Sequence, residues 1–268
     1  MAQLTIFSVA TDRYLEFWLD LVDSAEQFLA EDLTVQWILF TNRDLDIPEN
    51  VSQSLGRNLV IVRFESTPWP MPSLLRYELL AGVAEKVEGE IVMHLDADMI
   101  FANPISRSDL IQAIGANKIA LVRHPGYFRP RRSKRIKLYI RNPIFIIRDL
   151  KCLLLNGAIG SWEKNADSLA FVPRKDRSIY VCGGAWFGMK DSIINLCRLL
   201  SERIQKDLSR NVIAKFHDES HMNWYATNFK TSINSPSFCF ELSYPQLIGI
   251  TPTIIAVDKG NGSAWERQ

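Results

Sequence analysis

Short apolar runs alternate with amphipathic stretches through the first third of the chain, and this alternation restricts the fold more than any other feature. Leu4–Ala10 is apolar and too short for a helix, so we predict a buried strand. Tyr14–Leu29 carries apolar residues at spacings of three and four, which predicts a helix with one apolar face. Strands and helices alternating in this way predict an α/β fold with a Rossmann-like, mostly parallel sheet covered by helices on both faces.

The same patterns predict the other elements. Further helices are expected at Ser73–Val87, where Ser73 would cap the N-terminus, and at Asp191–Lys206 and His217–Ala226. Residues 124–166 break the alternation, and we expect there a long basic and apolar excursion from the sheet that carries its own helices. With 268 residues, near the upper limit for one hydrophobic core, the chain is predicted to form one domain over residues 1–268. Further strands are expected at Val35–Phe40, Leu59–Phe64, Glu90–Leu95, Ile119–Val122, Leu169–Pro173, Ile179–Gly188, Ser237–Leu242 and Thr253–Val257.

The composition indicates a globular protein. Hydrophobic residues make up 47% of the chain and charged residues 23%, which argues against disorder. No apolar run reaches the ~18 residues of a transmembrane helix, and the N-terminus lacks a signal-peptide pattern. The four cysteines (Cys152, Cys182, Cys197 and Cys239) show no CxxC spacing, which argues against a zinc site or a disulfide scaffold. These features predict a cytoplasmic protein.

The formal net charge of +1 hides an uneven distribution of charge. Residues 123–141 contain eight Lys or Arg and no Asp or Glu, which leaves 23 basic against 30 acidic residues elsewhere, a net charge of −7. Such a run is typically a solvated, mobile loop. It could also close over a bound diphosphate as a lid, or contact an anionic membrane at its inner face. Nucleic acid is the weakest alternative, because the rest of the chain is acidic and aromatic residues are not interleaved with the basic ones.

Two aspartates follow directly after a predicted strand. Asp96 and Asp98 are two residues apart, so on an extended chain their side chains would point the same way. Two carboxylates held together repel unless a cation lies beside them, and Mg²⁺ or Mn²⁺ accepts carboxylate and phosphate oxygens together. The pair therefore indicates metal-assisted binding of a nucleotide diphosphate at the edge of the sheet where ligands bind. The alternative is a solvated loop with incidental acidic residues.

A second cluster of polar residues begins a predicted helix. His217 and His221 are four residues apart and share a helix face, a spacing that can bind a metal, although no third ligand is evident. Asp218 and Glu219 would equally suit a helix N-terminus, where acidic residues favour the helix dipole. The spacing alone leaves both interpretations open.

Taken in order, several segments resemble the family 6 glycosyltransferases, the group that contains the blood-group A and B transferases and bacterial and phage relatives. The resemblance is collinear from residue 4 to about residue 260. Its most specific element is His-Asp-Glu-Ser-His followed by Asn, at residues 217–223. The other matching segments are residues 4–9, 75–78, 94–101, 124–128 and 179–188.

The resemblance implies a GT-A fold and a retaining enzyme. It would transfer N-acetylgalactosamine or galactose from a UDP-sugar to a galactoside acceptor, in an oligosaccharide or a lipid-linked glycan, with an α1,3 linkage. Asp96 and Asp98 match the metal- and donor-binding pair, which implies Mn²⁺ dependence, with Mg²⁺ as the other candidate. Glu219 matches the proposed nucleophile, which either attacks C1 from the β face or stabilises an oxocarbenium-like transition state. A front-face route would leave it only the second role.

The resemblance also assigns roles to other positions. Two glycines at 183 and 184 remove side-chain volume beside the C2 substituent of the sugar, so we expect UDP-GalNAc to be preferred over UDP-Gal. Vertebrate members of the family carry an anchor and a stem before the matched region, and since the sequence shows neither we expect a bacterial or phage-type member. The implied roles are a uracil pocket at Phe7, Val9 and Tyr14; donor contacts at Arg76, His217, Asp218 and Lys259; sugar selection at Cys182, Gly183 and Gly184; and acceptor contacts at His124 and Phe216.

Two other classes of function compete with this one. A retaining transferase of the glycogenin-like group would also place Asp-x-Asp after a strand, but its later His-x-Gly-x-x-Lys-Pro element is absent from the sequence. A carbohydrate-binding protein without turnover would not need Asp96, Asp98 and Glu219 together.

Overall fold

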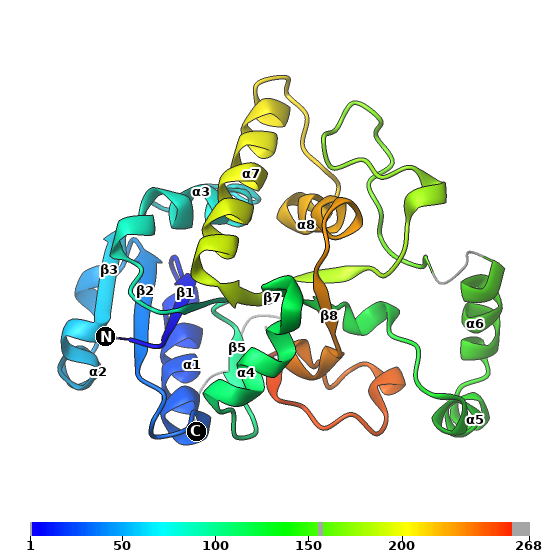
Figure 1. The fold of residues 1–268 in the computed structure, drawn as a ribbon, viewed down its shortest axis with the longest axis horizontal. Helices are drawn as coiled ribbons and strands as arrows, with labels where there is room; N and C mark the ends of the chain where they lie inside the picture. Colours follow the sequence, from blue (N-terminus) through cyan, green and yellow to red (C-terminus); the bar gives the residue numbers. More distant parts are fainter. Residues whose placement is uncertain (1, 155–157, 259–268) are drawn as a thin grey trace.

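A seven-stranded sheet forms the centre of the computed structural model, which describes residues 2–154 and 158–258 (Figure 1). Its strand order is β3-β2-β1-β4-β7-β6-β8, and β7 runs antiparallel to both of its neighbours while the other pairs are parallel. The prediction of a mostly parallel sheet is confirmed. The strands are β1 (Leu4–Val9), β2 (Val35–Thr41), β3 (Leu59–Arg63), β4 (Ile91–Leu95), β6 (Ile119–Arg123), β7 (Val181–Met189) and β8 (Ser232–Asn234).

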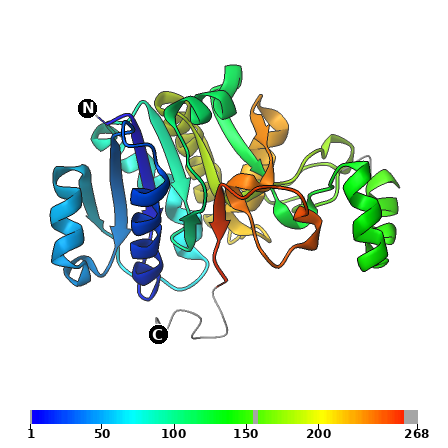
Figure 2. The same ribbon diagram turned by 90° about the horizontal axis from the view of Figure 1, so that it is seen from below.

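Helices cover both faces of the sheet. On one face, α1 (Tyr14–Phe28) and α4 (Arg107–Ile114) share a hydrophobic core with a small antiparallel sheet of β5 (Met99–Phe101) and β9 (Ile254–Ala256). On the other face, α3 (Met71–Gly82), α7 (Lys190–Leu208) and α8 (His217–Asn228) enclose a second core (Figures 1 and 2). A further helix, α2 (Glu49–Leu55), follows β2. Short 3₁₀ turns lie at Asp44–Asp46, Gly56–Asn58, Ala84–Lys86, Gly115–Asn117, Pro125–Tyr127, Arg174–Asp176, Pro236–Cys239 and Pro245–Leu247.

The central strands carry apolar side chains on both faces because helices cover both faces of the sheet. Leu4 and Ile6 of β1 pack in the core with α1, whereas Phe7 packs in the core with α3. Successive side chains on a strand point to opposite faces, so a strand buried on both sides reads as a continuous apolar run. This is why the strand positions could be predicted without an alternating pattern.

The excursion between β6 and β7 does carry its own helices, as expected. They are α5 (Arg132–Arg141) and α6 (Ile144–Leu154), which form one end of the molecule along its longest axis (Figures 1 and 2). The basic segment 123–141 is therefore not a loop throughout, because its second half is the helix α5. Leu138 of α5 and Phe145 of α6 are buried, and the two helices contact each other.

Two predicted strands and one predicted cap are wrong. Residues 169–170 form a turn and residues 171–173 have no regular structure, while residues 236–239 form a 3₁₀ turn after which Phe240 makes only an isolated bridge to Ile255. Ser73 does not cap α3, because the helix begins at Met71 and runs through Pro72 in its first turn. Proline is tolerated there, since the first backbone N–H groups of a helix have no partner within the helix.

The sequence patterns also missed several elements. The helix α4 begins with a capping box in which the Ser106 side chain accepts from the backbone of Asp109, while the Asp109 carboxylate accepts from the backbone of Ser106. Its Ser-x-x-Asp signature was present in the sequence. β5 and β8 are three residues each, too short for a periodic pattern to show. No helix among the described residues is long and apolar enough to cross a membrane.

Candidate functional site

The antiparallel strand β7 gathers the candidate residues at one edge of the sheet. Because β7 runs against its neighbours, its first residues lie beside the last residues of β4 and β6, where Leu95 pairs with Ala185 and Arg123 pairs with Val181. The acidic pair follows β4, the segment of His124 follows β6, and the start of α8 packs against β7. Segments more than 100 residues apart in the chain therefore meet at this edge.

The acidic pair lies in a turn between two cavities. The backbone N–H of Met99 donates to the carbonyl of Asp96 at 3.1 Å, so residues 96–98 are not extended as the sequence interpretation assumed. Asp96 and Asp98 nevertheless both line a first cavity and a second cavity. The pair forms the boundary that these two cavities share.

The first cavity lies beside the N-terminus of α3. Val9 and Tyr14 line it, as the resemblance implied, but Phe7 does not: it is completely buried and packs beneath, with its ring 4.7 Å from that of His94. Trp69, which the sequence did not single out, is 70% exposed at the cavity. The lining residues are Val9, Thr11, Tyr14, Trp69, Pro72, Ser73, Arg76, Asp96, Ala97 and Asp98.

Arg76 links the acidic pair to the start of α8. Its buried guanidinium lies 2.9 Å from Asp96 and 3.3 Å from Asp218, and donates to the carbonyl of Gly183 at 3.2 Å. Burial alone would lower the pKa of Arg76, but the charges of Asp218 and Asp96 raise it above its usual value. A permanently charged side chain therefore joins three segments of the site and partly compensates two of its carboxylates.

His94 completes this buried cluster rather than serving as simple packing. Its Nε2 lies 2.8 Å from Nη1 of Arg76 and 3.2 Å from Oδ1 of Asp96. Burial lowers the pKa of His94 to about 4, and the charge of Arg76 acts in the same direction. A neutral imidazole at pH 7 can accept a hydrogen bond from the guanidinium, so His94 supports the position of Arg76.

Glu219 lies at the second cavity and is held from two sides. The Tyr180 hydroxyl donates to Oε1 at 2.8 Å, and the backbone N–H of Gly183 donates to Oε2 at 3.0 Å. Burial raises the pKa of Glu219 to about 7, although both hydrogen bonds lower it, and the charges of Asp218 and Asp96 raise it further. The structure thus fixes the orientation of a carboxyl group that gains or loses its proton near neutral pH.

Tyr180 is a functional candidate that sequence reasoning missed. Burial and the charge of Glu219 raise the pKa of its hydroxyl above the usual value, so it remains a proton donor. Its ring contacts those of Tyr127 and Trp162, with centroids 5.2 Å away in each case. Tyr180 stood inside a matching segment, but no spacing rule pointed to its hydroxyl.

His124 faces Glu219 across the second cavity. The Gly126 N–H donates to its Nδ1 at 2.9 Å, so the ring proton is on Nε2, which lies 4.0 Å from Oε2 of Glu219. Burial lowers the pKa of His124 to about 4, so the ring is neutral at pH 7. An N–H directed toward the carboxylate and the cavity can orient a hydroxyl group placed between them.

Three other residues at the start of α8, which the resemblance assigned to donor or acceptor contacts, lie in three different environments. Asp218 is buried against Arg76, and burial raises its pKa to about 6. His217 has a positive φ of 45° and contacts the Trp69 ring edge-on at 5.1 Å, beside the first cavity. Phe216 is 37% exposed and does not line either cavity.

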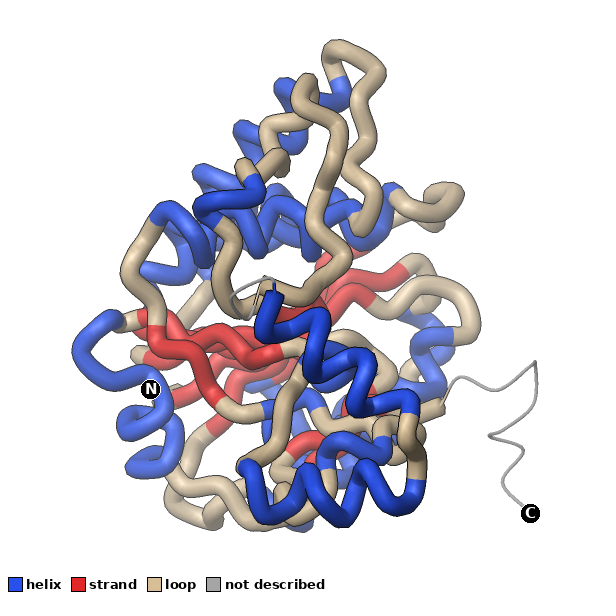
Figure 3. Tube along the Cα trace, turned by 90° about the vertical axis from the view of Figure 1, so that its right-hand side faces the viewer, coloured by secondary structure: helices blue, strands red, loops and turns tan. Residues whose placement is uncertain are grey.

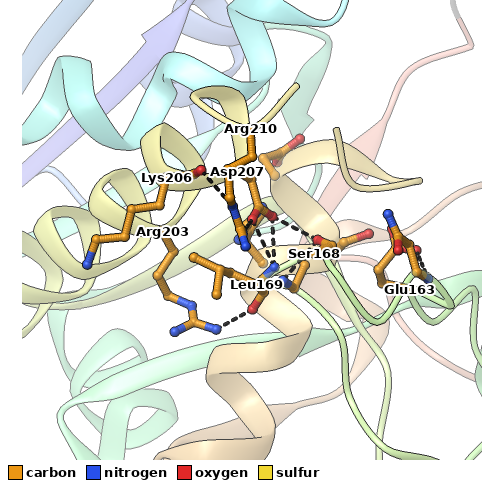
Figure 4. A network of polar contacts seen from close by, with 12 residues as sticks. Glu163, Ser168, Leu169, Arg203, Lys206, Asp207 and Arg210 are labelled. Carbon is orange, nitrogen blue, oxygen red and sulfur yellow. Dashed lines mark hydrogen bonds and ion pairs between the residues drawn. The ribbon is translucent and has the colours of Figure 1, made fainter. Parts of the chain in front are cut away.

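His221 turns away from the site, so it does not form a metal site with His217. Its Nε2 lies 3.6 Å from Asp207 of α7, and burial lowers its pKa to about 4. Asp207 also accepts hydrogen bonds from Ser168 at 2.8 Å and from the backbone of Leu169 at 2.9 Å (Figure 4). This network ties the chain after α6 to α7, which is why residues 169–173 form no strand.

Gly183 and Gly184 are required by the chain's own packing. A Cβ on Gly183 would lie 2.9 Å from a carboxylate oxygen of Asp218, and one on Gly184 would lie 2.8 Å from Oδ2 of Asp96. Protein atoms occupy this space, so these glycines let β7 approach the two acidic segments closely. The places where a Cβ would lie are therefore not free for the C2 substituent of a sugar. The two glycines do not support a preference for UDP-GalNAc over UDP-Gal.

The remaining wall of the second cavity comes from Cys182, Cys239 and the C-terminal segment. Both cysteines are buried and free. The backbone N–H of Val257 donates to the carbonyl of Asp98 at 2.8 Å, and Asp258 also lines the cavity. Lys259, expected at the diphosphate, lies outside the described residues. The cavity volume is about 910 Å³, within the range of small-molecule sites.

The carboxylates at the cavities suit a cation that binds to the protein and to a ligand at the same time. The described residues contain no group of three or more His, Cys, Asp or Glu side chains arranged to hold a metal. Asp96 and Asp98 alone supply two carboxylates between the cavities. Mg²⁺-like cations are commonly bound by one or two carboxylates, with phosphate oxygens and waters as the other ligands. The residues present therefore fit a cation that binds together with a diphosphate.

Comparison with known proteins agrees with this arrangement. Histo-blood group ABO system transferase 1 of Rattus norvegicus is 25% identical over 253 residues, which cover 91% of this chain and 63% of that protein. Globoside alpha-1,3-N-acetylgalactosaminyltransferase 1 of Canis lupus familiaris is 26% identical over 251 residues, with 91% and 62% covered. The O-antigen biosynthesis glycosyltransferase WbnI of Escherichia coli is 23% identical over 248 residues, with 92% and 89% covered.

The chain thus spans somewhat less than two thirds of the length of the two mammalian relatives and most of the bacterial one. The sequence profile described as Glycosyltransferase family 6 matches residues 2–143 and 158–259, leaving out only the ends and all of α6 with the residues after it. A match of this extent includes every segment that meets at the sheet edge, and the chain belongs to glycosyltransferase family 6.

Proposed function

We propose that the chain is a retaining glycosyltransferase that moves N-acetylgalactosamine or galactose from a UDP-sugar to a galactoside acceptor, with an α1,3 linkage. The observation that carries the proposal is the position of Glu219. It lines the second cavity together with Asp96 and Asp98, and that pair also lines the first cavity. A ligand with a base in the first cavity and its diphosphate at the pair would place its sugar in the second cavity, with Glu219.

The first cavity suits the uridine part of the donor. Trp69 and Tyr14 offer aromatic surface for a base, and Val9 adds apolar contact. The acidic pair would hold Mn²⁺, or Mg²⁺, together with the diphosphate. When bound, such a cation would neutralise negative charge that develops on UDP as it leaves. Arg76 lies 2.9 Å from Asp96 and would hold this carboxylate in place.

Glu219 would act on the β face of the donor sugar. In a double displacement its carboxylate attacks C1 while the bond to UDP breaks. The acceptor hydroxyl then attacks C1, the bond from C1 to Glu219 breaks, and the hydroxyl proton passes to a phosphate oxygen of the departed UDP. In a front-face route the same carboxylate stabilises positive charge at C1. In both routes Tyr180 and the N–H of Gly183 hold the carboxylate in place, and the neutral ring of His124 orients a hydroxyl group.

The named relatives support the class of donor. Several are globoside α1,3-N-acetylgalactosaminyltransferases, and others are histo-blood group ABO transferases. We propose UDP-GalNAc as the preferred donor, with UDP-Gal as the competitor. The acceptor would enter the open side of the second cavity beside His124 and Tyr244.

A donor hydrolysis screen tests the proposal. The protein is incubated with UDP-GalNAc, UDP-Gal, UDP-GlcNAc or UDP-Glc, each with Mn²⁺ or EDTA, and release of UDP is measured. We expect hydrolysis of the two galacto-configured donors, fastest for UDP-GalNAc, and loss of activity in EDTA. Equal rates for all four donors would contradict the donor class. Undiminished activity in EDTA would contradict the metal assignment alone.

A further inference from the structure

The helices α5 and α6 expose an unusual amount of apolar surface. Fourteen large apolar side chains are exposed among the described residues, and seven of these lie between Ile136 and Leu154. On α6 they are Ile144, Ile146, Ile147, Leu150 and Leu154, each more than half exposed. Monomeric proteins rarely leave such a concentration of apolar side chains in water without a partner.

These side chains form a face on α6. At about 100° per residue, Ile146, Leu150, Leu154 and Ile147 fall within about 100° of the helix circumference. Phe145 and Asp149 point to the opposite, buried side. On α5, Ile136 and Ile140 are one turn apart and both exposed, at 61% and 78%. Each helix is thus amphipathic with its apolar side turned outward.

Positive charge surrounds this apolar surface. Residues 123–154 contain ten Lys or Arg and one acidic residue, Asp149. Asp149 is buried and lies 3.1 Å from Arg135 and 3.2 Å from Arg129, so its charge is compensated inside the pair of helices. The exposed cations Arg132, Lys137 and Arg141 make no ion pair with a carboxylate of the described residues.

The helix pair stands at one end of the molecule and lies close to the site. Figure 3, viewed from that end, shows α5 and α6 in front of the rest of the chain. Only seven residues separate His124 of the second cavity from Arg132, where α5 begins. α5 also contacts the turn at Pro245–Leu247, which follows Tyr244 of the same cavity. A surface bound by this helix pair would therefore lie beside the second cavity.

We propose that the outer faces of α5 and α6 dock on an anionic lipid bilayer. Apolar side chains ringed by Lys and Arg are the pattern of a helix that lies in a membrane interface, with its cations at the lipid headgroups. A second copy of the chain would bring two strongly positive surfaces together, which disfavours self-association. Nucleic acid would leave the exposed isoleucines and leucines without a partner and would find no exposed aromatic residue on these helices to stack on.

The sequence profile of the family does not include α6. The profile of glycosyltransferase family 6 leaves residues 144–157 unmatched, and these include all of α6. The apolar face of α6 therefore is not part of the shared sequence pattern. Docking on a bilayer would not require that the chain carry out the proposed sugar transfer.

Co-sedimentation with vesicles tests the docking. Vesicles of phosphatidylcholine alone are compared with vesicles that also contain phosphatidylglycerol. We expect binding to the anionic vesicles only, and weaker binding as salt is raised. Lys137→Glu combined with Arg141→Glu should weaken binding at least ~25-fold, from about five-fold for each lost cation. Ile147→Ser combined with Leu150→Ser should also release the protein into the supernatant.

Matched substitutions elsewhere control for loss of charge or of apolar surface in general. Lys230→Glu and Leu45→Ser alter exposed residues far from α5 and α6 in the chain, and both variants should bind as the unaltered protein does. All variants should hydrolyse UDP-sugar at the same rate in the absence of lipid, so a failure of docking is distinguishable from a failure of the proposed reaction. Equal binding to both kinds of vesicle, no binding to either, or lipid-free dimers that Ile147→Ser with Leu150→Ser dissociates would overturn the proposal.

Discussion

The Tyr180 hydroxyl donates a 2.8 Å hydrogen bond to Oε1 of Glu219, from a position 39 residues earlier in the chain. Since this bond lowers the pKa of Glu219 while burial raises it, Tyr180 opposes the cost of ionising a buried carboxyl group. The pair explains how the protein can keep a carboxylate at a largely enclosed position near pH 7.

Replacing Tyr180 with phenylalanine should therefore change the pH profile as well as the rate. We expect kcat/KM for donor hydrolysis at pH 7 to fall about ten-fold or more, because a hydrogen bond to a charged group is lost. The apparent pKa of the acidic limb should rise, so that part of the activity returns at higher pH. Tyr127→Phe is the control, since the Tyr127 hydroxyl bonds to Ser161 and not to Glu219. A loss of rate with an unshifted profile would indicate a structural role only.

Glu219→Gln should reduce sugar transfer on the order of 10³-fold or more, because glutamine can neither attack C1 nor carry the negative charge that the transition state requires. Initial rates of UDP release with saturating donor measure this effect. Glu241 provides a matched carboxyl group at the same cavity. Its change to glutamine should alter donor hydrolysis only a few-fold. Near-normal turnover of Glu219→Gln would remove Glu219 from the mechanism.

The stability of the protein should depend on pH through Glu219. Its pKa is about 7 in the folded protein and 4.5 ordinarily, so the folded state holds the proton more tightly than the unfolded state. The resulting contribution is fully present below pH 4.5 and is lost as pH rises toward 7. We expect Glu219→Gln to be more stable than the unaltered protein at about pH 8, by up to ~3 kcal/mol, and equally stable near pH 4.

Urea unfolding followed by circular dichroism measures this difference across the pH range. A difference in the free energy of unfolding that stays constant with pH would show that the substitution acts through packing and not through the proton.

Gly184→Ala should damage both stability and donor binding. The new Cβ would lie 2.8 Å from Oδ2 of Asp96 and 2.8 Å from Cε of Met99, so the carboxylate must move. We expect about 1–3 kcal/mol of destabilisation and a clear loss of UDP affinity in the presence of Mn²⁺, measured by thermal unfolding and titration calorimetry. Gly82→Ala is the control, because no atom lies within 4 Å of its new Cβ apart from its chain neighbours and the backbone of its own helix. Equal affinities for the two variants would contradict the close approach.

Much of the fold could be predicted from the sequence because the central strands are buried on both sides. β1 and β4 are mostly apolar and buried at nearly every position, and a mostly apolar run can be recognised without knowing which strands lie beside it. The edge strand β8 at Ser232–Asn234 has no such signal, since it is short and only partly buried. Leu169–Pro173 misled the prediction because its apolar residues serve a turn that Asp207 holds through hydrogen bonds.

The site was less predictable than the fold. Spacing could select Asp96 and Asp98, but the resemblance to a family was needed to choose Arg76 and Glu219. Tyr180 was missed because its role depends on a contact with a helix that begins 37 residues later, and no periodicity encodes such a contact. Phe7 was assigned to a cavity wall although alternation along β1 turns it into the core.

The two cavities are lined by different stretches of the chain, and this affects how substitutions can change the site. Every residue that lines the first cavity lies between Val9 and Asp98, whereas the second cavity draws on residues from Asp96 to Asp258. The acidic pair is the overlap between these two stretches. Under the proposed function, substitutions after Asp98 can alter the part of the site assigned to the sugar and the acceptor without changing any side chain that lines the first cavity.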